Sequence, residues 1–306
     1  MFRFFLFGLF FSFMVQSQDL KNKEPYILIL GTIQDGGSPH ISCNRNCCRG
    51  LTEYQKNNRK RTSLALIFPT LKKYFLFEAT PDITNQMNQV EIKSGSFIEG
   101  VFITHAHIGH YSGLMFFGRE AMGAKNIKVY AMPRLQNFLK DNGPWNQLID
   151  QKNIVIKNLE NRKLIELFKN VKILPFKVPH RDEFSETVGY KIIGPNKTLL
   201  FIPDIDKWTK WEINIVEIIK EVDYALIDAT FYDESEINYR SISEIPHPFV
   251  IESMEMLKKI SPNDRNKIHF IHMNHTNPLL NNKSKESQIV IDEGYNISAK
   301  GDVFDL

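Results

Sequence analysis

Short apolar runs, each closed by polar or turn-forming residues, follow one another along most of the chain. Runs of this length that are rich in Ile, Val, Leu, Phe and Tyr are typical of buried strands. The pattern predicts strands at Pro25–Gly31, Thr62–Phe68, Tyr74–Glu78, Val101–Thr104, Ile127–Ala131, Val171–Val178, Val188–Ile193, Thr198–Ile202, Tyr224–Ile227 and Ile268–Ile271. The second and third of these are expected to form a hairpin.

Longer segments with helical character separate the strands. Pro81 suits the first turn of a helix, and further helices are expected over Tyr111–Met122, Pro133–Gln151, Trp208–Val222 and Phe249–Ile260. Strands and helices alternate in both halves, and no linker of altered composition divides them. We therefore expect an α/β fold in which two sheets pack face to face with helices outside, and a single domain over residues 18–306.

The first residues have a different character. Arg3 precedes an apolar stretch, Phe4–Val15, and Val15 and Ser17 suit the −3 and −1 positions of a cleavage site. The stretch is short for a membrane-spanning helix, which needs about 20 apolar residues. We expect residues 1–17 to be a signal peptide and the mature protein to be exported, to the periplasm, without a membrane span. An uncleaved anchor is the alternative.

Composition and charge narrow the function classes only a little. The chain has 306 residues, 42% of them hydrophobic, and a formal net charge of +3. Such a small excess, with one short basic run at Lys56–Arg61, does not favour nucleic-acid binding. A small-molecule substrate is expected, and the sequence gives no indication of an oligomeric state.

The strongest chemical signal is the segment Thr104–Gly113, THAHIGHYSG. Alternate residues of an extended segment point to the same side, so His105 and His107 can hold one cation together. His110 lies a little further on, where it can face the same cavity. Because neutral imidazole is the commonest metal ligand, the segment predicts a metal site rather than a solvated turn.

All three cysteines, Cys43, Cys47 and Cys48, lie close together. An odd number with two of them adjacent fits poorly with a disulfide framework, even in an exported protein. A clustered odd set is more typical of metal ligation.

The histidine segment resembles the His-x-His-x-Asp-His motif of the metallo-β-lactamase superfamily, and the other motifs of that superfamily follow in order at strand ends. They are Glu78 in YFLFEATPD, His180 in FKVPHRDEF, Asp204 in LLFIPDID and His272 in FIHMNH. The resemblance spans about residues 26–280. It implies the metallo-β-lactamase fold, a four-layer αββα sandwich with two mixed sheets.

The resemblance also implies two ligand sets. His105, His107 and His180 resemble the first metal site, whereas His110, His272 and Asp204 resemble the second, with Asp204 bridging. Asp204 and His110 are the expected catalytic residues, Asp204 because it bridges the metals or positions the nucleophile.

One position departs from the motif, because Gly109 stands where the superfamily has an aspartate that ligates the second metal. The second site then keeps two histidines and one carboxylate, a set that suits non-haem iron, although zinc or manganese fits it too. Introducing the missing carboxylate by Gly109→Asp is expected to raise the zinc affinity of that site.

A closer resemblance is to the branch that contains pyrroloquinoline-quinone biosynthesis protein B and the phosphonate-operon cyclic phosphodiesterase. It is carried by QDGGSPH with the cysteine loop, LIDATFYDESE and MNHTNPLL. The branch implies a structural zinc on Cys43, Cys47, Cys48 and His275, with His40 in reserve. The spacing C-x-x-x-C-C, in place of C-x-C-x-x-C, leaves open which thiols bind. Asp228 and Thr230 resemble a segment that lines the site, although a buried turn is an equal alternative.

The expected function is that of a metal-dependent hydrolase, in which metal-bound water attacks an ester, a phosphodiester or an amide. It would hold one structural zinc and one or two catalytic zinc ions. The alternative is an iron-dependent oxygenase resembling the quinone-biosynthesis protein, with iron or manganese at the second site. A non-catalytic metal-binding protein of the same fold is a third possibility.

Overall fold

The computed structural model describes residues 24–237 and 244–306. The predicted signal peptide, residues 1–17, lies outside these ranges. Among the helices within them, none combines the length and the apolar character that crossing a membrane requires.

The strands form two sheets of seven strands each. The first sheet has the order β14 (Val303–Asp305), β1 (Tyr26–Gly31), β2 (Ser63–Phe68), β3 (Lys73–Phe77), β4 (Phe97–Phe102), β5 (Ile127–Ala131) and β6 (Ile154–Asn158). The second has the order β13 (Asn296–Ile297), β12 (Ile268–Ile271), β11 (Tyr224–Asp228), β10 (Thr198–Ile202), β9 (Val188–Ile193), β8 (Lys172–Lys177) and β7 (Ile165–Glu166). Both contain parallel and antiparallel pairs, and β2 and β3 form the expected antiparallel pair.

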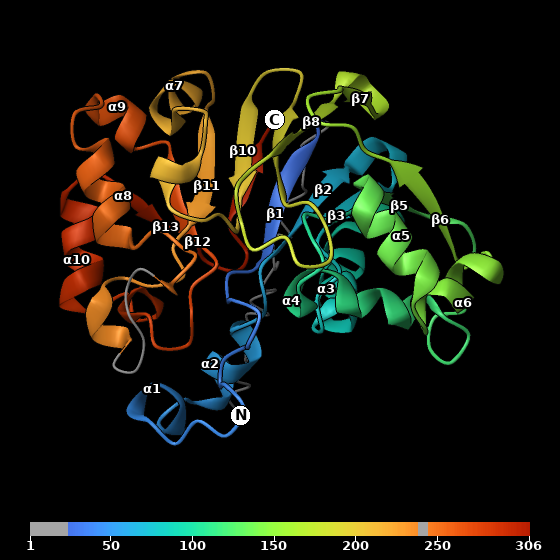
Figure 1. The fold of residues 1–306 in the computed structure, drawn as a ribbon, viewed down its shortest axis with the longest axis horizontal. Helices are drawn as coiled ribbons and strands as arrows, with labels where there is room; N and C mark the ends of the chain where they lie inside the picture. The colour runs from blue at the N-terminus through green and yellow to red at the C-terminus, as the bar shows by residue number, and fades with distance from the viewer. Residues whose placement is uncertain (1–23, 238–243) are drawn as a thin grey trace, which may run out of the picture.

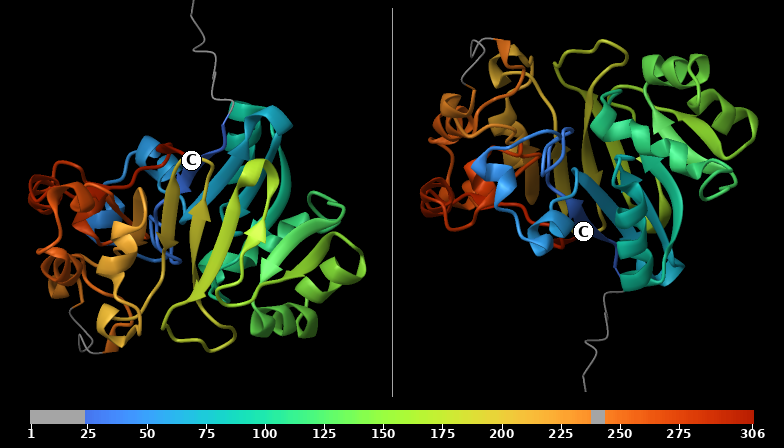
Figure 2. Two further views of the ribbon diagram at one scale, coloured as in Figure 1. Left: turned by 90° about the horizontal axis from the view of Figure 1, so that it is seen from above. Right: turned by 90° about the horizontal axis from the view of Figure 1, so that it is seen from below.

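Helices cover the outer face of each sheet (Figures 1 and 2). On the first sheet lie α3 (Ile83–Ser94), α5 (Pro133–Asp141) and α6 (Trp145–Asp150), and on the second α7 (Ile215–Lys220), α8 (Val250–Leu257) and α10 (Lys285–Asp292). The short helices α1 (Asn46–Arg49), α2 (Glu53–Asn58), α4 (Ile108–Tyr111) and α9 (Pro262–Arg265) lie in connecting segments. The four-layer αββα fold that the sequence predicted is confirmed.

The continuous apolar runs follow from burial on both faces of the strands. In β1, Ile27 and Ile29 point into the core between the two sheets, whereas Leu28 and Leu30 pack in the core beneath the first sheet's helices. The other central strands divide in the same way. Each sheet is therefore apolar on both sides, and polar groups concentrate at the strand ends.

Two expected helices are shorter than predicted. The segment after the histidines forms α4 and a 3-10 turn at Ser112–Phe117, because the Gly113 N–H donates to the Ala79 carbonyl (2.8 Å). The segment Trp208–Val222 is helical only at Trp208–Lys210 and in α7. Its tryptophans have tertiary partners, since the Trp208 indole donates to Ser253 Oγ at 2.8 Å. Strands β6, β7, β13 and β14 and helices α1, α2, α9 and α10 were not predicted.

Aromatic side chains in the core that separates the two sheets hold the end of β4 in place, and β4 leads to the histidine segment. The Phe102 ring stacks on Phe77 and Tyr130, with centroids 5.1 and 4.2 Å apart. From the second sheet, the Tyr190 hydroxyl donates a buried hydrogen bond of 2.6 Å to the Ile103 carbonyl. The backbone just before His105 is thus held by both sheets.

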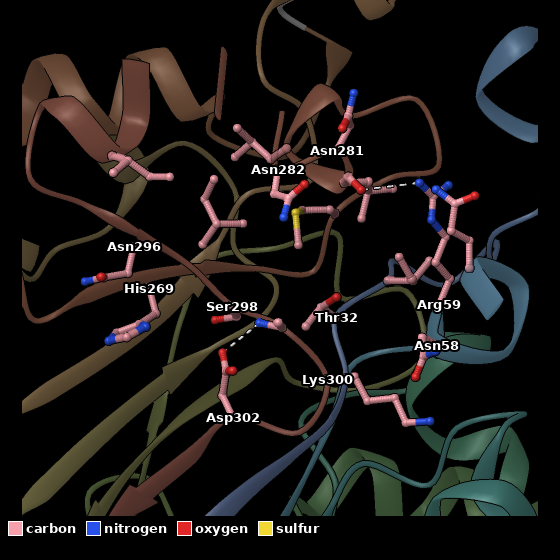
Figure 3. A pocket seen from close by; sticks show the side chains of 18 of the residues that line it. Thr32, Asn58, Arg59, His269, Asn281, Asn282, Asn296, Ser298, Lys300 and Asp302 are labelled. Atoms are coloured by element: carbon pink, nitrogen blue, oxygen red, sulfur yellow. Dashed lines mark hydrogen bonds between the residues drawn. The ribbon is translucent and has the colours of Figure 1, made fainter. Parts of the chain in front are cut away.

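A cavity of about 860 Å³ lies beside the C-terminal strands and α2 (Figure 3). Its wall includes Arg59, Lys300 and His269, and the His269 ring packs edge-on against Phe304. Burial lowers the pKa of His269 to about 4, so the ring is neutral at physiological pH.

Replacing His269 by Phe or by Gln should flatten the acid side of the stability profile. The pKa of His269 in the folded state lies below the unfolded value of about 6.5, so the unfolded chain binds more protons as the pH falls. The stability that the neutral ring contributes is therefore complete above pH 6.5 and is lost as the pH falls toward 4. Between pH 7.5 and 5, urea unfolding should show wild type losing up to about 2 kcal/mol more than either variant. Equal losses in all three proteins would contradict the assignment.

Candidate metal centre

The chain segments that follow the strands of both sheets meet around one buried carboxylate, Asp204. This residue comes after β10, whereas His272 follows β12 and His180 follows β8 in the same sheet. The histidine segment arrives from β4 of the first sheet. Side chains placed at strand ends are held by the rigid sheets and remain accessible.

The first group of potential ligands contains His105, His107, His180 and Asp204, with one nitrogen or oxygen atom of each within 4.8 Å of the others. His105 Nε2 lies 2.8 Å from His107 Nδ1 and 3.4 Å from Asp204 Oδ2. Asp204 Oδ1 lies 3.7 Å from His180 Nε2. The three predicted histidines are therefore brought together around the predicted bridging residue.

The second group shares Asp204 with the first. It contains Asp35, His110, Asp204 and His272. Asp204 Oδ2 lies 3.1 Å from His110 Nε2 and 3.6 Å from His272 Nε2. The structure thus brings together all six residues that the sequence suggested and adds Asp35.

Many buried polar atoms in the two groups have no hydrogen-bond partner. They are Asp35 Oδ1, Asp204 Oδ1, His272 Nε2 and both ring nitrogens of His110 and of His180. Buried polar groups are normally paired, and a cluster of orphaned ones calls for an explanation such as an ion. Histidine nitrogens and carboxylate oxygens are ligands of zinc and related divalent metals. The residues present therefore fit two cations that share Asp204.

Polar neighbours orient the histidines, as expected around a metal site. Glu78 Oε1 lies 3.3 Å from His110 Nδ1, and its Oε2 accepts a hydrogen bond from the Thr104 backbone at 3.3 Å. The Thr230 hydroxyl lies 3.1 Å from His272 Nδ1. Glu78 and His272 have positive φ angles of 77° and 66°, a conformation that side chains disfavour and that clusters at functional sites.

Burial and neighbouring charges set the protonation of the site. Burial lowers the pKa of His180 to about 4 and holds that of His105 well below its usual range, so both rings are neutral. Burial alone would raise the pKa of Asp204, but His272, His180 and His247 hold it well below its usual range. Burial would lower the pKa of His110, but Asp35 and Glu78 raise it well above its usual value. The centre thus combines an ionised Asp204 with neutral His105 and His180 rings, the forms that bind metals.

His247 also reaches this centre, although the sequence gave no indication of it. Its Nδ1 lies 2.8 Å from Asp228 Oδ2 and 3.2 Å from Asp204 Oδ1. Asp228 is itself fixed, since its Oδ1 accepts hydrogen bonds from the backbone N–H and the hydroxyl of Thr230, at 2.8 and 2.7 Å. Of the two readings of Asp228 and Thr230, the structure favours a place beside the site over a mere buried turn.

The space at Gly109 is already taken. A Cβ atom added at this position would lie 2.3 Å from Asp35 Oδ1 and 2.7 Å from Asp35 Cα. The second group consequently has two carboxylates, not the single one expected from the sequence. The prediction for Gly109→Asp assumed free space at this position, whereas the new side chain would collide with Asp35.

The three cysteines and His275 form a separate group, again within 4.8 Å of one another. All three thiols are free, with Cys43 Sγ 3.8 Å from Cys47 Sγ. His40, the predicted reserve ligand, stacks on the His275 ring with centroids 4.5 Å apart. Burial lowers the pKa of His275 to about 4, which keeps the ring neutral.

A pocket of about 490 Å³ lies between the cysteine group and His247. Arg45 and Arg181 bring positive charge to its wall, and Phe231 brings an apolar surface. The cavity in Figure 3, in contrast, is lined by none of the residues that make up the ligand groups of the described chain. The pocket beside His247 is thus the one suited to present a substrate to the centre.

Of the residues that sequence reasoning missed, only one carried a usable signal. Asp35 follows the predicted strand Pro25–Gly31 in the same way that Asp204 and His272 follow theirs. His247 precedes α8 in the sequence Pro-His-Pro, away from any strand end. Only the folded chain reveals its place.

Comparison with known proteins agrees with this architecture. Coenzyme PQQ synthesis protein B of Methylococcus capsulatus is 24% identical over 90% of this chain and 98% of its own length, and that of Klebsiella pneumoniae is 22% identical over 90% and 96%. Zinc-bound PqqB from Methylobacterium extorquens has a similar fold, with a TM-score of 0.75 and 21% identity over 92% of this chain and all of that one. A diphosphatase from the PhnP family gives a TM-score of 0.67 and 20% identity over 92% and 97%.

The family model of the beta-lactamase superfamily domain matches residues 73–273, which include all the motif residues from Glu78 to His272. This match covers most of the first sheet and the second sheet through β12. The chain belongs to the beta-lactamase superfamily.

Proposed function

We propose that this chain is a zinc-dependent hydrolase that cleaves a phosphodiester or a similar anionic ester. The observation that supports it best is the buried Asp204, shared by two groups of histidines in which both ring nitrogens of His110 and of His180, and Nε2 of His272, lack hydrogen-bond partners. Divalent metal ions on these groups would lower the pKa of a water molecule and polarise the bond to be cleaved.

The proposed role of His247 is to donate a proton to the leaving group. Asp228 accepts from its Nδ1, which fixes the ring orientation and stabilises the protonated form. Burial would lower the pKa of His247, but Asp228 and Asp204 raise it above its usual value. The side chain lines the pocket beside the metal groups, where the leaving oxygen of a substrate would lie.

The preference for an anionic substrate rests on the pocket wall. Arg45 and Arg181 can bind phosphate oxygens. The apolar side chains of Phe231 and Ile245 offer a surface for the organic part of the substrate. A neutral amide would make no use of the two arginines.

His180→Ala should reduce hydrolysis of bis(p-nitrophenyl) phosphate by roughly a thousandfold or more, since catalysis by metal-activated water depends on an intact ligand set. His269→Phe is the matched control, because it removes another histidine that lies outside the centre and should retain turnover. Circular dichroism checks the fold of both. Undiminished turnover by a folded His180→Ala protein would refute the proposal.

His247→Gln should make the rate depend on the leaving group. A general acid contributes about 10²–10⁴-fold, and it matters most when the departing oxygen is strongly basic. We expect a large loss with a dialkyl phosphodiester, which must expel an alkoxide, and a much smaller loss with bis(p-nitrophenyl) phosphate, which expels p-nitrophenolate. Equal losses for both classes of leaving group would argue against proton donation by His247.

We further propose that Cys43, Cys47, Cys48 and His275 hold a structural zinc. Three thiols and one imidazole are a complete tetrahedral set, and the loop that carries them lines the pocket. The ion would therefore stiffen the wall that includes Arg45.

Cys43→Ser should remove one zinc per chain and lower the Tm by roughly 5–10 °C, because a metal bound only to the folded state stabilises it. Metal analysis and thermal unfolding measure the two effects. Wild type with a thiol reductant is the control, since a zinc site tolerates reduction and a disulfide does not. A variant with full zinc content and unchanged Tm would exclude the site.

An iron-dependent oxygenase is the second candidate, because the sequence resemblance to the quinone-biosynthesis branch implies it, and the relatives named coenzyme PQQ synthesis protein B belong to that branch. The second carboxylate near His110 weakens the case, because it departs from the two-histidine, one-carboxylate set typical of such iron enzymes. Elemental analysis separates the two. Two or more zinc ions per chain support the hydrolase, whereas one zinc with bound iron, and oxygen uptake, support the oxygenase.

A further inference from the structure

Asp35 reaches the metal centre along an unusual route. After β1 ends, the chain continues in an extended conformation. Ile33 forms one parallel β-bridge with Arg61, which precedes β2 of the first sheet, and another with Met273, which follows β12 of the second sheet. Gln34 N donates to the Met273 carbonyl (2.9 Å), and Met273 N donates to Thr32 O (2.8 Å). Met273 directly follows His272, so the bridge fixes Asp35 relative to that ligand.

The backbone of Asp35 is secured on its other side. Its carbonyl accepts a hydrogen bond from Arg61 Nε at 2.7 Å, and the Arg61 guanidinium pairs with Asp82 at 3.1 Å. These contacts use the backbone of Asp35 and leave its carboxylate for the centre. A carboxylate held in this way is preorganised, because its position does not depend on a bound ion.

The carboxylate itself points at the second ligand group. Asp35 Oδ1 lies 2.8 Å from His110 Nε2 and 3.4 Å from His272 Nε2, and it is buried without a hydrogen bond of good geometry. Those are the same ring nitrogens that approach Asp204. The free oxygen of Asp35 therefore converges on the point that the other three ligand atoms surround.

Gly109 is the counterpart of this arrangement. A Cβ there would fall 2.3 Å from Asp35 Oδ1 and 2.6 Å from its Cγ. The carboxylate of Asp35 thus occupies the volume into which a side chain at position 109 would extend. An acidic residue at 109 and the observed Asp35 exclude each other sterically.

We propose that Asp35 is the fourth ligand of the second metal position, in place of an acidic side chain at position 109, and that Gly109 is required to admit it. The second position then has two imidazoles and two carboxylates, counting the shared Asp204. This inference rests on the two-metal centre proposed above. The missing carboxylate is then that of Asp35, which follows β1. With Asp35 the second position has four ligands and is a complete zinc site, whereas without it one coordination position would be open.

Zinc titration of the metal-free protein, followed by calorimetry, tests the proposal without any assay of turnover. Wild type should bind two ions at the histidine groups besides the ion at the cysteines. Asp35→Asn retains the size of the side chain but removes its charge, and we expect the second ion to bind at least about 100-fold more weakly. Cobalt substitution gives a second readout, since loss of a ligand changes the visible absorption of the bound ion.

Gly109→Ala is the more specific variant, because the added methyl group cannot bind a metal and acts only through the space that it occupies. It should displace the Asp35 carboxylate and weaken the second ion in the same way. Gly50→Ala is the matched control, since the nearest atom to its added Cβ lies 3.9 Å away, and it should bind zinc as wild type does. Thermal unfolding of the metal-free proteins shows whether each variant is folded, and Asp35→Asn carries the test if Gly109→Ala is not.

The outcomes separate this inference from the proposed function. Two ions in wild type and an unchanged second affinity in Asp35→Asn would overturn the role of Asp35 and leave the two-metal hydrolase standing. A single ion at the histidine groups of wild type would instead overturn the two-metal centre itself. Weakening of the second ion by both Asp35→Asn and Gly109→Ala, with the first ion unaffected, supports the proposal.

Discussion

The burial of one negative charge, the Asp204 carboxylate, is the constraint on which the centre depends. A buried ionised carboxylate is strongly unfavourable unless charges or hydrogen-bond donors surround it. Here His110, His180 and His272 approach it from three chain segments and hold its pKa low. The ring nitrogens that approach it lack good hydrogen bonds, so the arrangement is suited to cations bound between them. The residues that compensate this charge are the same residues that the proposed chemistry uses.

The two sheets contribute to this compensation together. The first sheet supplies the histidine segment, and the second supplies Asp204, His180 and His272. Tyr190 of the second sheet holds the carbonyl of Ile103, just before His105. The Ile33 bridge in turn ties the end of β1 to Met273. The packing of the two sheets against each other therefore also sets the distances between the ligand atoms of the centre, because it fixes the relative positions of the strands that carry them.

The sequence predicted the fold and most of the residues at the centre, for a physical reason. Strands buried on both faces are continuous apolar runs, and polar residues that end such runs stand out, as Asp204 and His272 do. Helix lengths were less predictable, because Trp208 and Gly113 take tertiary partners that interrupt regular helices. The short strands β13 and β14 carry too few apolar residues to be recognised.

The residues that escaped prediction did so because their roles depend on contacts distant in the sequence. Gly109 indicated only a lost ligand, and nothing near it pointed to Asp35, more than seventy positions earlier. A glycine that makes room for another side chain cannot be told from one that merely lacks a side chain until both backbones are placed. His247 is a similar case, since its partner Asp228 lies on β11.

The bridge between Ile33 and Met273 also bears on the order in which the protein can mature. It joins residues at opposite ends of the described chain, and such distant pairings form late, because the entropy of closing a long loop must be lost first. While the chain is still being synthesised, the cysteine loop with Cys43 is made long before His275, and Asp35 long before His272. Neither ligand group is complete until the last strands have docked. Metal binding at these two groups would therefore come late, and a chain truncated before β12 would keep only the first group, His105, His107, His180 and Asp204, whole.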